Sequence, residues 1–83
     1  MQYIVFNSIT LATRIKNHFR FSGQQVMLTH TPKEISNGGC SYSIVAEKSL
    51  TDEVIKAAEE YGIKILGIYE QTADGFSQVK KTL

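Results

Sequence analysis

The fold is decided at residues 3–8, which read Tyr3-Ile4-Val5-Phe6-Asn7-Ser8. The first four are β-branched or aromatic residues, which favour a strand, and the last two favour turns and helix caps. From Ser8 the apolar residues recur at helical spacing as far as Phe19, and Gly23 follows in the position of a helix-ending glycine. The sequence therefore predicts a strand that is followed by an amphipathic helix.

The rest of the chain extends this pattern. A helical turn is expected after the second strand, because Thr31, Pro32 and Glu34 have the form of a capping box with Thr31 as the cap. A second helix is expected to begin at a cap formed by Ser49 or Thr51. The predicted strands lie over residues 3–6, 25–30, 41–47 and 63–69.

The order β-α-β-β-α-β predicts an α+β fold of the ferredoxin-like type, a four-stranded antiparallel sheet with two helices on one face. Residues 1–70 are expected to form this single domain, and residues 71–83 a polar C-terminal tail that is either disordered or folded back. The strands at 3–6 and 63–69 are apolar on both sides, so the helix-free face also needs a cover. We expect that cover from a second copy, in a homodimer, or from the tail.

Composition excludes several classes of function. The 83 residues include 9 Lys+Arg and 8 Asp+Glu, which gives a net charge of +1, whereas binding that is driven by phosphate contacts needs a clearly basic face. No stretch approaches the ~20 apolar residues of a membrane span, and residues 1–6 do not resemble the basic start of a secretory signal. We expect a cytoplasmic protein without a membrane partner, and we do not expect nucleic acid as a partner.

The strongest nucleophile is the single cysteine, Cys40. One cysteine excludes an internal disulfide, CxxC redox chemistry and cysteine-rich zinc sites, and no spacing matches a metal motif. We therefore expect neither a metal nor a cofactor. Gly38 and Gly39 come directly before Cys40 at the start of a predicted strand, where they allow an open turn and keep side chains away from the thiol.

Several neighbours could support this thiol. The amides of the two glycines and of Cys40 could form an anion-binding nest, which would favour a thiolate. His30 ends the strand before the loop, Lys33 lies in the turn that follows, and Ser41 comes directly after the cysteine. The opposing interpretation is a buried structural cysteine with a solvated histidine at a strand end, because free cysteine is among the most buried residue types.

The two predicted helices differ in charge. The first carries Arg14, Lys16 and Arg20 and no acid, whereas the second carries four acids against one lysine. We expect the two helices to attract each other; the alternative is that the first helix docks an acidic partner or steers anions. His18 lies on the apolar side of the first helix and is expected to pack at the edge of the core.

Two segments resemble a known family. They are residues 3–8 with the helix that follows, and the stretch Thr31-Pro32-Lys33-Glu34-Ile35-Ser36 that leads to Cys40. Over about residues 3–70 the chain resembles the Putative Se/S carrier protein-like family of small bacterial proteins, formerly a domain of unknown function. It differs from the family pattern in the two glycines before the cysteine and in Ser41 after it.

The resemblance implies that Cys40 takes up sulfur or selenium as a persulfide or selenopersulfide and passes it to an acceptor protein. It further implies a donor of the cysteine desulfurase or selenocysteine lyase type, and a carrier rather than a turnover enzyme. Two alternatives stay open. One is a non-catalytic regulatory or oligomerisation module that uses the helix-free face. The other is an RNA-binding domain, although residues 41–47 lack the basic-aromatic RNP1 pattern.

Overall fold

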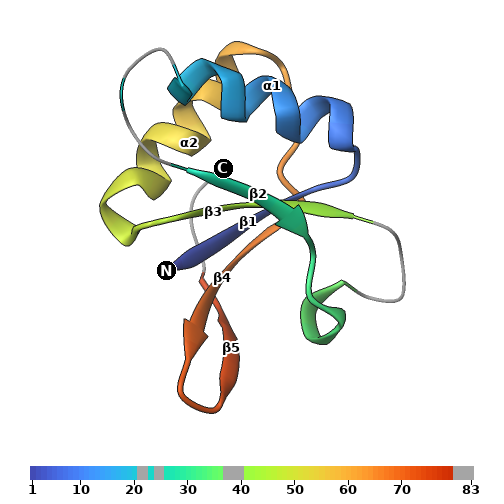
Figure 1. Ribbon diagram of the computed structural model, residues 1–83, viewed down its shortest axis with the longest axis vertical. Helices are drawn as coiled ribbons and strands as arrows, with labels where there is room; N and C mark the ends of the chain where they lie inside the picture. Colours follow the sequence, from blue (N-terminus) through green and yellow to red (C-terminus); the bar gives the residue numbers. More distant parts are fainter. Residues whose placement is uncertain (21–22, 24–25, 37–40, 80–83) are drawn as a thin grey trace.

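The structure is a computed structural model that describes residues 1–20, 23, 26–36 and 41–79. The predicted α+β class is correct. Within the described ranges, no helix has the length and apolar character that crossing a membrane requires. The elements are, in chain order (Figure 1), β1 (Gln2–Phe6), α1 (Ile9–Arg20), β2 (Met27–His30), the 3-10 turn η1 (Lys33–Ile35), β3 (Tyr42–Ala46), α2 (Lys48–Glu60), β4 (Gly67–Thr72) and β5 (Gly75–Gln78).

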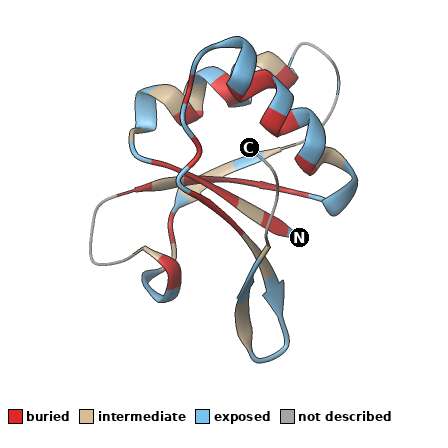
Figure 2. Cartoon of the chain, turned by 180° about the vertical axis from the view of Figure 1, so that it is seen from behind, coloured by how far each residue is buried: buried red, intermediate tan, exposed pale blue. Residues whose placement is uncertain are grey.

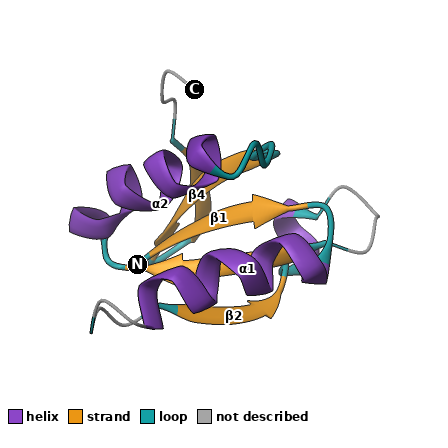
Figure 3. Cartoon of the chain, turned by 90° about the horizontal axis from the view of Figure 1, so that it is seen from above, coloured by secondary structure: helices purple, strands orange, loops and turns teal. Residues whose placement is uncertain are grey.

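All strands belong to one antiparallel sheet in the order β2-β3-β1-β4-β5. β1 is the central strand, and its Ile4 lies opposite both Ile44 of β3 and Ile68 of β4. Both helices cover the same face of the sheet (Figure 3), as predicted. The prediction of four strands is wrong, because β5 adds a fifth beside β4.

The fifth strand lies in the stretch that was expected to be a polar tail. β4 continues to Thr72, and a two-residue turn brings Gly75 opposite it with φ +135. The Thr72 hydroxyl donates to the Gly75 carbonyl oxygen at 3.2 Å. Alternating hydropathy is weak here, so the useful signal was Gly75, because the positive φ that follows the turn favours glycine.

β4 begins at Gly67, four residues later than predicted, although α2 ends in a glycine cap at Gly62. Gly62 has φ +68, and its N–H donates to the Glu59 carbonyl oxygen while that of Ile63 donates to the Ala58 carbonyl oxygen. These two bonds define a Schellman cap. Ile63 and Ile65, just after the cap, are buried in the core cluster without forming a strand, whereas Leu66 is exposed.

The core lies between the sheet and the two helices. In Figure 2, buried residues line the helix sides that face the strands. The largest fully buried side chains in this layer include Phe6 of β1 and Phe19 of α1. The buried residues of the cluster are Ile4, Phe6, Ala12, Ile15, Phe19, Ile44, Ala46, Val54, Ile55, Ala57, Ala58, Ile63, Ile65 and Ile68.

A buried polar pair links β1 to α2. The Thr51 hydroxyl donates to the Gln2 side-chain carbonyl, and both residues are buried. The prediction that Ser49 or Thr51 caps α2 is therefore wrong: the N-cap is Glu47, which makes no side-chain capping bond. Thr51 lies one turn inside the helix and faces the sheet, where its hydroxyl finds a partner that is distant in sequence.

The helix-free face is partly covered by the chain itself. Tyr3 of β1 packs edge-on against Phe76 of β5, with ring centroids 5.2 Å apart. Val5 and Val45, which share this face with Tyr3, are buried within the single chain. η1 contacts β5, and its Ile35 is also buried. The expected homodimer stays a prediction.

The Gly62 cap gives a test of the fold. Gly62→Ala is expected to lower the free energy of unfolding by about 1–2 kcal/mol, because a left-handed backbone is costly for a residue with a Cβ. No atom lies within 4 Å of the added Cβ, so the cost is conformational. Gly62→Asn, the control, should lose less, since asparagine tolerates this conformation. If urea denaturation shows equal losses for the two variants, the left-handed conformation of Gly62 is not the cause of the loss.

Candidate functional site

The candidate site is described through the residues that flank Cys40. Cys40, Gly38 and Gly39 lie outside the described residues. Ser41, His30 and Lys33, the other three predicted site residues, are all described. His30 lies at the end of β2, Lys33 lies in η1, and Ser41 lies just before β3.

The ends of β2 and β3 are held together where the intervening segment leaves the sheet. His30 pairs with Tyr42 as the last register position of the two strands. One residue further on, the Thr31 N–H donates to the Ser41 carbonyl oxygen at 3.0 Å. Residues 32–40 therefore connect two positions that are hydrogen-bonded to each other.

A buried hydroxyl pair strengthens this closure. Thr31 Oγ1 and Ser43 Oγ are 2.7 Å apart, and both residues are buried. The prediction that the Thr31 side chain caps the following turn is wrong, because η1 has Pro32 as its N-cap residue and no side-chain capping bond. Thr31 is still positioned by the sheet, so its hydroxyl reaches the neighbouring strand.

Ser41 has a distinctive environment. It is 9% exposed, and its Oγ is a buried side-chain atom with no hydrogen-bond partner among the described residues. Buried polar groups normally have a partner, and leaving one unpaired carries a cost in stability. The hydroxyl directly after Cys40 in the sequence therefore receives no partner from the part of the chain that the structure describes.

His30 and Lys33 are both exposed. The His30 ring stacks on Tyr42 with centroids 4.7 Å apart and a tilt of 38°. Since successive strand residues point to opposite faces, His30 and Thr31 leave β2 on different sides. Lys33 forms no ion pair within the described part of the chain. The structure shows no contact between His30 and Lys33, although both of these described residues lie at the same end of the sheet, in β2 and in η1.

Sequence reasoning missed the hydroxyl pair between Thr31 and Ser43. The available signal was the run of small hydroxyl residues on alternate positions of both strands, including Thr29, which lies opposite Ser43. Pairing them correctly requires the strand register, and the single sequence does not specify it. The described residues contain no group of three or more His, Cys, Asp or Glu that could hold a metal ion.

The hydroxyl pair of Thr31 and Ser43 is expected to stabilise the ends of β2 and β3 beside the candidate site. Thr31→Val and Ser43→Ala should each lower the free energy of unfolding by about 1–3 kcal/mol, because each substitution removes one hydroxyl and leaves the other buried without its partner. The double variant should lose less than the sum of the two. Urea denaturation measures all three, with Thr29→Val as the control on the same strand face. Strictly additive losses would show that the two hydroxyls are not coupled.

Comparison with known proteins gives a family. The model of the Putative Se/S carrier protein-like family matches residues 1–70, a stretch that includes Cys40 and runs from β1 into β4. No curated protein and no solved structure matches the chain. The match confirms the resemblance that the sequence motifs indicated. This chain therefore belongs to the Putative Se/S carrier protein-like family.

Proposed function

We propose that this protein carries sulfur or selenium on Cys40, as a persulfide or selenopersulfide, and passes it to an acceptor protein. Membership of the family carries the proposal of a carrier role. The choice of residue is supported by the sequence, because Cys40 is the single cysteine and only a thiol can hold a persulfide.

Loading is a thiol exchange in which atoms and electrons balance. The Cys40 thiolate attacks the terminal sulfur of a persulfide on the donor's cysteine. A new S–S bond forms as the donor's S–S bond breaks, and the donor cysteine leaves as a thiolate. The same attack on a donor-bound selenium gives the selenopersulfide. No outside oxidant or reductant is needed, and a donor of the cysteine desulfurase or selenocysteine lyase type supplies the load.

Unloading reverses the roles. A nucleophile on the acceptor protein attacks the terminal sulfur or selenium, and Cys40 leaves as a thiolate. The lack of a second cysteine supports this step, since a neighbouring thiol would attack the persulfide and form a disulfide instead. The thiol must start reduced, which is in keeping with the proposed cytoplasmic location.

The frame around the segment supports a carrier. Two successive partners must each reach the load, so the carrying segment needs fixed ends and accessible surroundings. The Thr31–Ser41 and Thr31–Ser43 bonds fix its ends on the sheet, while His30 and Lys33 at its borders are exposed. The Ser41 hydroxyl, which has no partner among the described residues, is a hydrogen-bond donor next to Cys40 in sequence; we include it as a positioning residue.

Intact-protein mass spectrometry tests loading directly. Protein kept without oxygen or reductant is incubated with a cysteine desulfurase and cysteine, and in parallel with a selenocysteine lyase and selenocysteine. The native chain should gain the mass of one sulfur or one selenium atom, and reductant should remove it. A native chain that stays unloaded with both donors would overturn the proposal.

A matched variant tests whether the position of the thiol matters. The double change Cys40→Ser with Ser41→Cys keeps the composition and the single thiol but moves it by one residue. Because the residue 41 side chain is buried, the moved thiol should load at least about tenfold more slowly, as expected for a sulfur with poor access. Equal loading of both proteins would show that Cys40 is not a specific carrier position.

A further inference from the structure

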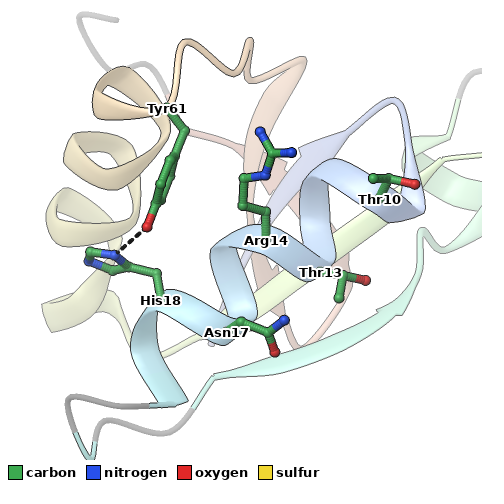
Figure 4. Close-up of a pocket in the computed structure, with 6 residues that line it drawn as sticks. All are labelled: Thr10, Thr13, Arg14, Asn17, His18 and Tyr61. Atoms are coloured by element: carbon green, nitrogen blue, oxygen red, sulfur yellow. Dashed lines mark hydrogen bonds between the residues drawn. The ribbon is translucent and has the colours of Figure 1, made fainter.

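A groove on the outer side of α1 is separate from the candidate site. It has a volume of about 370 Å³, and none of the site residues described above lines it. Figure 4 shows that most of its lining side chains lie along α1, and that Tyr61 extends toward them from the end of α2. They are Thr10, Thr13, Arg14, Asn17, His18 and Tyr61.

Helical spacing places five of these residues on one stripe. Positions 10, 13, 14, 17 and 18 follow the i, i+3, i+4, i+7, i+8 pattern that brings side chains to a single face. That pattern usually marks the apolar face of a helix, and here it marks a polar one. The core-facing residues Ala12, Ile15 and Phe19 form a different stripe, so the groove residues do not serve the core.

Tyr61 and His18 form a fixed wall of the groove. The Tyr61 hydroxyl oxygen and His18 Nδ1 are 3.0 Å apart, and the two rings meet edge to face with centroids 5.6 Å apart. His18 is half-buried and also packs edge-on against Phe19, as expected for a residue at the edge of the core. The tyrosine ring is thereby held beside the groove although 42% of Tyr61 is exposed.

Arg14 gives the groove its charge. It is exposed, it is the one charged arginine, lysine or acid in the lining, and it forms no ion pair within the described part of the chain. The expected attraction between the helices thus does not engage Arg14 in a direct ion pair. A guanidinium is always charged, and its planar set of N–H donors fits a carboxylate or a phosphate.

We propose that this groove binds a small molecule through a phosphate or carboxylate group. Arg14 pairs with the anionic group, the Tyr61 ring on the same side contacts the ligand, and the polar side chains of Thr10, Thr13 and Asn17 offer hydrogen bonds to its other parts. The groove is an open surface depression, so the bound molecule keeps part of its surface in water. The inference does not depend on Cys40.

NMR titration of the amide signals tests the proposal. Inorganic phosphate and succinate are added separately to the full chain at constant ionic strength, with chloride as the reference salt. One of them should give saturable shifts at the groove residues of α1 and at Tyr61. Saturation by phosphate alone identifies a phosphate group, and saturation by succinate alone a carboxylate. Shifts that never saturate with either anion would overturn the proposal.

Two matched variants separate the groove from general charge. Arg14→Gln and Lys16→Gln each remove one positive charge from an exposed position on α1, but only Arg14 lines the groove. Arg14→Gln should weaken binding about tenfold, as expected for loss of a charged hydrogen bond, whereas Lys16→Gln should change it less than twofold. Equal weakening in both folded variants would show that the anion is attracted only by the overall positive charge of α1, and it would contradict a binding site at the groove.

Discussion

Burial of β1 on both of its faces is the constraint on which the rest of the structure depends. Ile4 and Phe6 face the helices, whereas Tyr3 and Val5 face the other side. A strand of this kind needs a layer above it and a layer below it. α1 and α2 provide the first, and η1 with β5 contributes to the second. The connection that leads to Cys40 is thus also part of the packing of the sheet.

Much of this fold could be predicted because its main signals are local. The period change after Phe6 identifies β1 and α1, and Gly62 marks the end of α2. β5 was missed because a hairpin depends mainly on backbone hydrogen bonds, and its polar residues give little alternation. The caps assigned to Thr31 and Thr51 were wrong for a different reason. Their hydroxyls bond to Ser43 and Gln2, partners that only the tertiary fold brings close.

The candidate site, too, has features that the sequence alone could predict and features that only the tertiary structure reveals. Cys40 could be proposed from the sequence because it is the single cysteine of the chain, and its role stays a prediction. The closure of the segment before it depends on the register between β2 and β3, which two short strands do not reveal by themselves. The alternative of a module that acts through the helix-free face receives less support, because Val5 and Val45 are already buried within one chain. The face has a structural role that the sequence pattern left open.

The contact between η1 and β5 has a consequence for the order of synthesis. Residues 1–70 contain every position that the family model matches, yet β5 begins at Gly75. A nascent chain that has reached residue 70 therefore holds the segment with Cys40 but not the strand that η1 packs against. The turn before the cysteine gains this neighbour only after β5 has left the ribosome. In this chain, the contact between η1 and β5 can therefore form only after residues 75–78 have been synthesised.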